Sequence, residues 1–252
     1  MPHFLHDDVE IAFRDEGEGP PVVLVHGFAS NKDVNWAYTS WITALTAAGR
    51  RVIALDNRGH GASRKLYDPA AYHSAIMADD VRALLDHLQL AHADVLGYSL
   101  GARIAAFLAL AHPGRVRSAV FGGLGMGLVD GLNDTDKIAR ALEAPTLADV
   151  SEPGGHMYRA FAEKTHSDLR ALSACIRGAR QTMSREDVAR IAVPVLVAVG
   201  ENDQVAGSPE GLAVLIPGAQ AFRIPGRDHM LAVGDRRFKE AVWSFLGVDA
   251  KS

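Results

Sequence analysis

The segment Val95-Leu-Gly-Tyr-Ser-Leu-Gly101 is the most informative about the fold, because it places the pattern G-x-S-x-G between two apolar segments. The residues before it form a short apolar run that predicts a buried strand. Residues 99–111 are apolar on nearly every side, which predicts a buried helix. A strand that reverses into a helix at one residue strains that residue and leaves no room for side chains two positions away. The pattern therefore predicts a sharp turn with Ser99 at its apex.

Short apolar runs recur along the chain and alternate with helical patterns. Residues 4–5 and 9–14 flank Asp7-Asp8 and predict an antiparallel hairpin. Later runs are nearly continuous, as in parallel strands covered on both faces. Together they predict an α/β fold: a mostly parallel, doubly wound sheet with an antiparallel N-terminal edge. The later strands are expected at 22–25, 52–55, 95–96, 119–121, 195–199 and 221–224, with helices at 36–48, 76–90, 99–111 and 237–245.

The alternation of strand and helix is interrupted between residues 122 and 192. Glycine-rich sequence there gives way to helical segments that carry many charged residues, with breaks at Pro145 and Pro153. We therefore predict a single domain over residues 1–252, in which residues 122–192 contain a small helical insertion.

Ser99 is a candidate nucleophile, and a serine hydroxyl needs a positioned base. His229 follows the short strand predicted at 221–224, in Pro225-Gly-Arg-Asp-His229. The imidazole in turn needs an acid that fixes its tautomer, and Asp203 comes directly after an apolar run of the C-terminal half. The chain order Ser99, Asp203, His229 is the nucleophile–acid–base order expected when the serine lies on such a turn. Asp228 is a rival acid, but neighbouring side chains on a loop usually point apart.

An oxyanion hole would complete this constellation. His26-Gly27-Phe28 follows the first parallel strand, and Gly27 lets the next peptide turn its N–H toward the nucleophile. We expect the two donors to be the backbone N–H groups of Phe28 and Leu100.

Five segments together resemble successive signatures of the α/β-hydrolase superfamily. The resemblance covers nearly the whole chain outside the insertion, which stands where that family carries its cap, and it implies a serine esterase-like member with a small cap. By this resemblance Ser99, Asp203 and His229 form the catalytic triad, and Phe28 and Leu100 form the oxyanion hole. The segments are His26-Gly27-Phe28, Asp56-Asn-Arg-Gly-His-Gly61, Gly97-Tyr-Ser-Leu-Gly101, Gly200-Glu-Asn-Asp203 and Gly226-Arg-Asp-His229.

The reaction expected from these residues is hydrolysis of carboxylic esters through an acyl-enzyme intermediate, without a cofactor. The same triad could serve a carbon–carbon bond hydrolase or a lactonase, and a non-turnover ligand receptor on the same fold is the alternative from another class. The expected substrate is a small-molecule ester, and the short insertion leaves polyester chains open as substrates.

Several other residues have a structural and a functional interpretation. Met126, Met157 and Tyr158 could contact substrate or pack inside the insertion. His26 and His60 are expected to order their loops, and Cys175 to be a buried, unreactive thiol. No histidine spacing predicts a metal site, and no charged residue stands out as a clamp for a substrate carboxylate.

Composition narrows the class of protein further. The 252 residues carry a net charge of −4 and are 48% hydrophobic, which is ordinary for a globular protein and unlike a general nucleic-acid binder. The N-terminus lacks the pattern of a signal peptide, and no apolar run is long enough to span a bilayer. We therefore expect a cytoplasmic protein without a nucleic-acid or membrane partner; the oligomeric state is left open.

Overall fold

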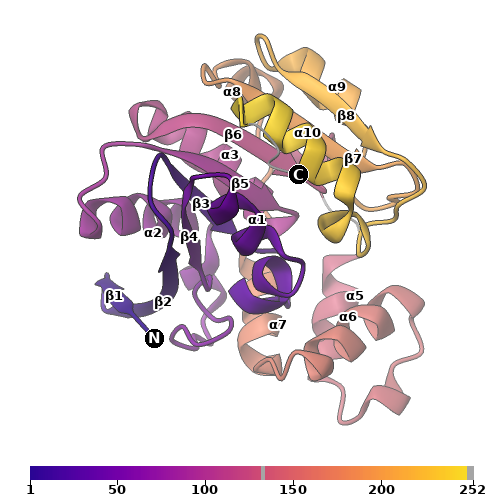
Figure 1. Cartoon of the computed structure of the whole chain (residues 1–252). Helices are drawn as coiled ribbons and strands as arrows, with labels where there is room; N and C mark the ends of the chain where they lie inside the picture. Colours follow the sequence, from indigo (N-terminus) through magenta and orange to yellow (C-terminus); the bar gives the residue numbers. More distant parts are fainter. Residues whose placement is uncertain (132–133, 249–252) are drawn as a thin grey trace.

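The computed structural model describes residues 1–131 and 134–248. Within this part of the chain eight strands form one sheet, in the order β1-β2-β4-β3-β5-β6-β7-β8 (Figure 1). β2 pairs antiparallel with β1 and β4, and all other pairs are parallel, which confirms the predicted α/β fold with its antiparallel edge. The strands are His3–His6 (β1), Val9–Glu16 (β2), Pro21–Val25 (β3), Arg51–Leu55 (β4), Ala93–Tyr98 (β5), Val116–Gly122 (β6), Val195–Gly200 (β7) and Gln220–Ile224 (β8).

Helices cover both faces of the sheet. Val22 and Leu24 of β3 pack with Trp41 of α1 and Phe238 of α10, whereas the alternate residues of β3 pack with α2 and α3 on the other face. The strands are apolar nearly throughout because both of their faces are buried. The helices are Trp41–Ala47 (α1), Ser74–His87 (α2), Leu100–Ala111 (α3), Gly127–Asp130 (α4), Thr135–Glu143 (α5), Pro153–Lys164 (α6), Leu169–Gly178 (α7), Arg185–Ala189 (α8), Pro209–Leu215 (α9) and Arg236–Leu246 (α10).

The predicted N-terminal hairpin is confirmed. β1 and β2 pair in register through His6 and Val9. Asp7 and Asp8 between them have φ of 45° and 59°, the left-handed conformation that a tight two-residue hairpin turn requires.

The single helix predicted over residues 36–48 is wrong. The chain instead forms a short π-helical turn, Asp33–Ala37, and then α1, with Ser40 between them at φ 63°. Trp36 and Trp41 are both fully buried and pack edge to face. Five residues apart on one continuous helix, they would point to different faces, so the break at Ser40 lets both indoles reach the core.

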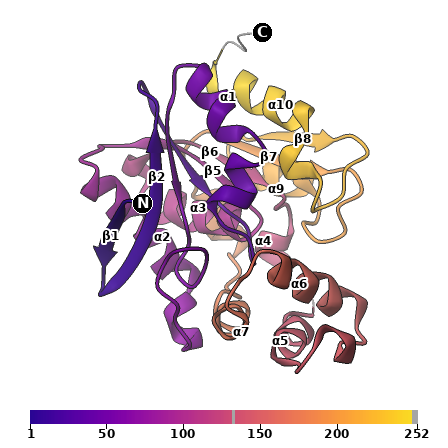
Figure 2. The ribbon, with the colours of Figure 1, turned by 60° about the horizontal axis from the view of Figure 1, so that its bottom comes forward.

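Helices α4 to α8 lie between β6 and β7, inside the segment 122–192 that the sequence predicts to hold a helical insertion. α5, α6 and α7 share an apolar cluster that includes Ile138, Leu142, Ala162 and Leu172. Figure 2 shows α5 and α6 set apart from the sheet as a separate helical layer. Ala29, from the loop after β3, belongs to the same cluster and connects this layer to the sheet.

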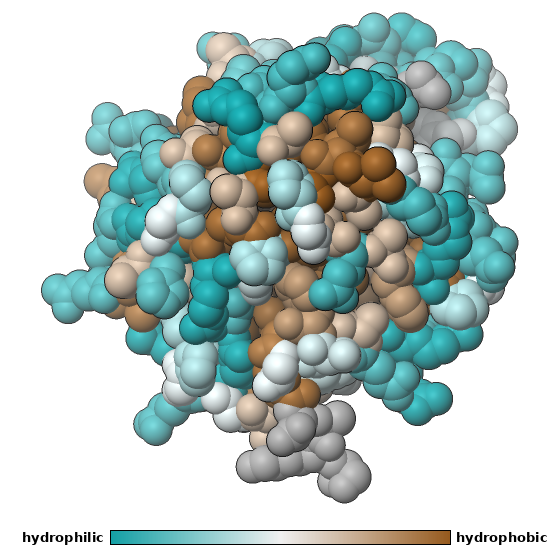
Figure 3. All heavy atoms as spheres, turned by 90° about the horizontal axis from the view of Figure 1, so that it is seen from above, coloured by the Kyte–Doolittle hydropathy of each residue, from teal (hydrophilic) through white to brown (hydrophobic). Residues whose placement is uncertain are grey.

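Polar and apolar residues are mixed on the outside of the molecule. Figure 3 views the end away from α5 and α6, where hydrophilic residues surround a smaller hydrophobic area. In the described ranges, no helix combines the length and apolar character needed to cross a membrane.

Candidate active site

Ser99 lies at a sharp turn between β5 and α3. Its backbone has φ 53° and ψ −112°, a conformation that a residue with a side chain adopts only under strain. The Ser99 N–H donates a 2.7 Å hydrogen bond to the carbonyl oxygen of Gly122 on β6, which holds the turn against the sheet. The strain directs the hydroxyl outward at the N-terminus of α3.

The two glycines around Ser99 are required by close backbone contacts. A Cβ atom on Gly97 would lie 2.2 Å from the carbonyl oxygen of Gly101. A Cβ on Gly101 would lie 1.9 Å from the carbonyl oxygen of Val25 on β3. Both positions therefore exclude any side chain, as the G-x-S-x-G pattern predicts.

Three loops bring Ser99, His229 and Asp203 into one hydrogen-bonded chain. They follow β5, β8 and β7, strands whose carboxyl ends meet at one edge of the sheet. His229 Nε2 lies 3.0 Å from Ser99 Oγ, and His229 Nδ1 lies 2.7 Å from Asp203 Oδ2. A neutral ring with its hydrogen on Nδ1 donates to the carboxylate and accepts from the hydroxyl, which is the arrangement that activates a serine.

The carboxylate of Asp203 is held in its ionised form. Burial opposes ionisation, but the hydrogen bond and charge of His229 and the N–H groups of Val205 and Ala206 outweigh it, so the pKa of Asp203 lies below its ordinary value. The rival acid, Asp228, instead accepts hydrogen bonds from the N–H groups of Met230 and Leu231. The structure therefore brings Asp203 to the imidazole and uses Asp228 to order the loop.

The backbone N–H groups of Phe28 and Leu100 border the same site. Leu100 is the first residue of α3, where the helix dipole is positive. Neither N–H has a hydrogen-bond acceptor among residues 1–131 and 134–248. Both donors are therefore free to bond an oxygen atom of a bound ligand.

His26 and Asn35 hold the Phe28 loop in place. His26 Nδ1–H donates a 2.7 Å hydrogen bond to the carbonyl oxygen of Gly27, and His26 Nε2 accepts one from the Asn57 N–H. The Asn35 side chain accepts from the Gly27 N–H at 3.1 Å. His26 is fully buried, and burial lowers the pKa of its ring. These contacts agree with a structural role for His26.

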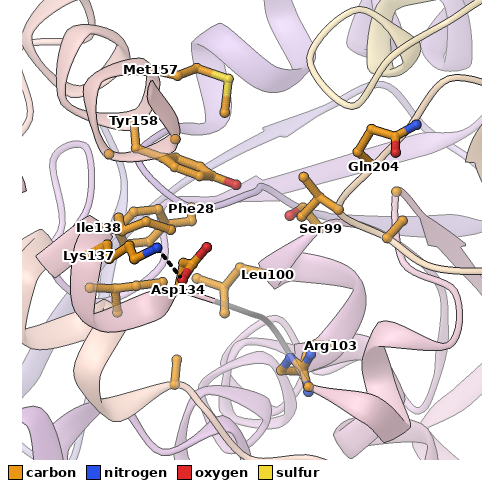
Figure 4. Close-up of a pocket in the computed structure, with 18 of the residues that line it drawn as sticks. Phe28, Ser99, Leu100, Arg103, Asp134, Lys137, Ile138, Met157, Tyr158 and Gln204 are labelled. Atoms are coloured by element: carbon orange, nitrogen blue, oxygen red, sulfur yellow. Dashed lines mark ion pairs between the residues drawn. The ribbon is translucent and has the colours of Figure 1, made fainter. Parts of the chain in front are cut away.

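A cavity of about 470 Å³ lies against Ser99, between the sheet and the helical layer (Figure 4). Met157 and Tyr158 of α6, two of the three residues predicted to contact substrate, line it. Cys175 lines it from α7 but is fully buried, and burial raises the pKa of its thiol well above the ordinary value, so the thiol stays protonated.

Met126 lies elsewhere. Its side chain packs against Gly211 of α9, and its N–H donates to the carbonyl oxygen of Ser208. The backbone around Met126 is thus bonded to the segment after Asp203, and this directs the side chain under α9 and away from the cavity. The structure does not place Met126 with the other two predicted contacts.

Tyr98 and Arg103 are site residues that sequence reasoning missed. The Tyr98 hydroxyl donates a 2.6 Å hydrogen bond to the carbonyl oxygen of His229, and Arg103 lines the cavity from α3. In the sequence, Tyr98 has the pattern of an apolar strand residue. Arg103 is a single charged residue in a helix whose other residues predict burial in the core. In the described ranges, no three His, Cys, Asp or Glu side chains are grouped closely enough to hold a metal ion.

This fold is that of an α/β hydrolase. Residues 20–170 match the family described as the alpha/beta hydrolase fold, and the chain belongs to it. Its relatives include the non-heme chloroperoxidase CPO-A1 of Kitasatospora aureofaciens, which is 29% identical over 95% of this chain and 97% of that protein.

Solved structures agree with this assignment. A hydrolase from Pseudomonas aeruginosa PA01 superposes with a TM-score of 0.81 at 27% identity, covering 98% of each chain. Est816, described as an N-acyl homoserine lactone degrading enzyme, superposes with a TM-score of 0.77 at 28% identity. The match covers 97% of this chain and 100% of that chain.

Proposed function

We propose that this α/β hydrolase cleaves carboxylic esters through an acyl-enzyme intermediate, with Ser99, His229 and Asp203 as its catalytic triad. The observation that carries the proposal is the hydrogen-bonded chain from Asp203 through His229 to Ser99, which opens on a cavity. The unbonded N–H groups of Phe28 and Leu100 beside Ser99 support it as well.

In the first half of the reaction, Ser99 Oγ forms a bond to the ester carbonyl carbon while His229 Nε2 takes the hydroxyl proton. The carbonyl oxygen becomes an anion and accepts hydrogen bonds from the N–H groups of Phe28 and Leu100. Each donor of this kind typically contributes about 2.7–4 kcal/mol to transition-state stabilisation. The bond to the alcohol oxygen then breaks, and His229 gives its proton to the leaving alkoxide.

In the second half, water attacks the acyl carbon. His229 takes a proton from this water and returns it to Ser99 Oγ as the acid leaves. Asp203 keeps the ring in the tautomer that accepts from Ser99 and stabilises the imidazolium formed in both halves.

Tyr158 and Met157 are proposed to contact the substrate from α6. Burial, with the charge of Asp203 as a smaller cause, raises the pKa of Tyr158 to about 12. Its hydroxyl therefore stays a neutral hydrogen-bond donor at neutral pH. Figure 4 shows the Tyr158 ring and the Met157 sulfur above Ser99 and Leu100 on the cavity lining.

Lactone opening is the second candidate, favoured by the 28% identity to the lactone-degrading Est816 over nearly the whole chain. A lactone is a cyclic ester, so each proton transfer is the same, and the alcohol stays attached to the acyl group. The same triad chemistry acts on open-chain esters and on lactones, so assays on both substrates distinguish the two candidates.

The test is a set of esters of increasing acyl length, assayed beside lactones and a vinylogous diketone that reports carbon–carbon cleavage. Ser99→Ala serves as the blank, and Ser151→Ala is the matched control because Ser151 is exposed. Hydrogen peroxide is added in one arm as an alternative to water, because of the similarity to a chloroperoxidase.

The proposal predicts ester turnover by the wild type and the Ser151→Ala protein and none by the Ser99→Ala blank. Turnover of the diketone alone would replace the proposal with a carbon–carbon hydrolase. A single slow turnover with the product retained would replace it with a ligand receptor.

A further inference from the structure

Two cavities meet at Ser99. The larger, of about 470 Å³, and a smaller one of about 170 Å³ share Ser99, Phe28 and Tyr158 in their linings. The smaller cavity is also lined by His229 and Met230. The larger one extends along α3 to Arg103 and out to the helical layer.

The position of His229 assigns the two cavities to the two halves of an ester. The imidazole must hand its proton to the leaving alcohol oxygen, so the alcohol has to lie on the side that His229 lines. A space of about 170 Å³ suits a short alcohol. The acyl chain then extends into the larger cavity.

Arg103 gives the larger cavity an unusual wall. It stands four residues after Ser99, one turn along α3, and is only 2% exposed. Figure 4 shows Ser99, Leu100 and Arg103 along one side of the cavity. The guanidinium donates to the carbonyl oxygens of Gln181 and Gly127. In the described part of the chain, the Arg103 guanidinium forms no hydrogen bond and no ion pair with a carboxylate. Its Nε–H group has no acceptor there either.

Other buried arginines of this protein do have a carboxylate partner. Arg50 pairs with Asp94, Arg58 with both oxygens of Asp80, and Arg159 with Glu163. A buried charge without a counter-ion is costly, and buried charges in proteins are usually paired. A carboxylate on the substrate would give Arg103 the counter-ion that the described chain does not supply. Burial lowers the pKa of Arg103 to about 10, so the group is still a cation at neutral pH.

The other charges of the cavity do not neutralise Arg103. Asp134 and Glu152 line its outer part, where their side chains are 61% and 56% exposed. Both face Lys137, at 3.0 Å and 3.7 Å from its Nζ. Among the described residues that line the cavity, Arg103 is therefore the one cation without a carboxylate beside it.

Resting on the proposed esterase function, we propose that the natural substrate is a short-alcohol ester whose acyl chain ends in a carboxylate held by Arg103. The alcohol occupies the cavity beside His229, and the acyl chain runs along α3. Hydrolysis releases the alcohol and a dicarboxylate, with no further reactant than water.

The experiment compares three methyl esters of matched length: monomethyl adipate, its carboxamide analogue methyl adipamate, and methyl aminohexanoate. They end in a carboxylate, a neutral amide and an ammonium group. Methanol release is followed for the wild type, Arg103→Gln and Arg103→Lys. Arg236→Gln is the control, because Arg236 is 84% exposed on α10. Monomethyl succinate, glutarate and pimelate set the preferred length.

For the wild type we expect kcat/KM at least tenfold higher for the carboxylate than for the amide, with the ammonium ester slowest. Arg103→Gln should reduce the carboxylate-to-amide ratio at least tenfold, mainly through KM. Arg103→Lys should keep part of the preference, and Arg236→Gln should keep all of it.

A wild-type enzyme that cleaves carboxylate and amide esters equally, or prefers the ammonium ester, overturns this inference while the esterase proposal stands. So does an Arg103→Gln protein that loses the same factor on all three esters, since Arg103 would then only tie Gln181 and Gly127 together. If no ester is cleaved, the esterase proposal fails. Calorimetry of adipate with the Ser99→Ala protein then decides, because binding lost in Ser99→Ala/Arg103→Gln supports the anion site and no binding contradicts it.

Discussion

The hydroxyl of Tyr98 donates a 2.6 Å hydrogen bond to the backbone carbonyl oxygen of His229, across 131 residues of sequence. Tyr98 directly precedes Ser99, so this bond joins the turn that carries the nucleophile to the loop that carries the base. Tyr98 is almost fully buried, with 4% of its surface exposed. The geometry makes Tyr98 a positioning residue for the pair.

Tyr98→Phe should therefore lower kcat several-fold with little change in KM, because the ring stays and only the bond to His229 is lost. The unpaired carbonyl should also reduce the free energy of unfolding by about 1–3 kcal/mol. Steady-state kinetics and denaturant unfolding measure the two effects. Tyr38→Phe is the control, since Tyr38 is 79% exposed. An unchanged kcat in Tyr98→Phe would show that His229 is positioned by other contacts.

Two aspartates lie near His229, and only Asp203 contacts its ring. Asp203→Asn should lower kcat by about 10⁴-fold, because an amide cannot hold the imidazole in the accepting tautomer. Asp228→Asn should change kcat by less than about threefold, since an asparagine oxygen can still accept from the N–H groups of Met230 and Leu231. The reverse order of effects would make Asp228 the acid.

Gly101 tests the strained turn through stability. Alanine usually favours a helix over glycine by about 1 kcal/mol, but here its Cβ would meet the Val25 carbonyl oxygen at 1.9 Å. We expect Gly101→Ala to destabilise the protein by about 3 kcal/mol or more, beyond the usual range for overpacking. Gly114→Ala should be nearly neutral, because nothing lies within 4 Å of a Cβ there. Thermal unfolding of the two variants gives the comparison, and equal melting temperatures would contradict the packing described.

His60 predicts how stability depends on pH. It is fully buried, and burial, with the charge of His26 as a smaller cause, lowers the pKa of its ring to about 3. In the unfolded chain a histidine takes up a proton near pH 6.5. Between these two values the unfolded state binds a proton that the folded state does not, so stability falls as pH drops from about 6.5 towards 3.

His60→Phe should make the free energy of unfolding less dependent on pH in that window, by about one proton per molecule. Urea unfolding from pH 7 to pH 4 measures this slope, which is independent of any constant loss of stability. His92→Gln, at an exposed position, should leave the slope unchanged. A slope that is the same in His60→Phe and the wild type would mean that His60 takes up its proton in the folded protein as readily as in the unfolded chain.

Local sequence patterns predicted most of the fold and the arrangement of Ser99, His229 and Asp203. The turn around Ser99 depends on neighbouring residues, and the loops of Asp203 and His229 follow strands that are recognisable from their apolar runs. The order of parallel strands then places all three at one edge of the sheet. These features depend on short-range rules that a single sequence displays.

Features that depend on long-range packing could not be predicted in this way. The break before α1 follows from two tryptophans that must both reach the core. Met126 is held away from the other two predicted contacts because its backbone N–H bonds to the carbonyl oxygen of Ser208. In the sequence, Arg103 is only a single charged residue in an apolar helix. Its lack of a carboxylate partner among the described residues can be seen only in the folded chain.

Covalent labelling with a fluorophosphonate, followed by mass mapping of the labelled peptide, tests whether His229 activates Ser99. Ser99 Oγ displaces fluoride from phosphorus only if His229 removes its proton. We expect one label per chain, located on Ser99, with none in Ser99→Ala and strongly slowed labelling in His229→Ala. A folded wild-type protein that stays unlabelled, or carries the label on another residue, would contradict it.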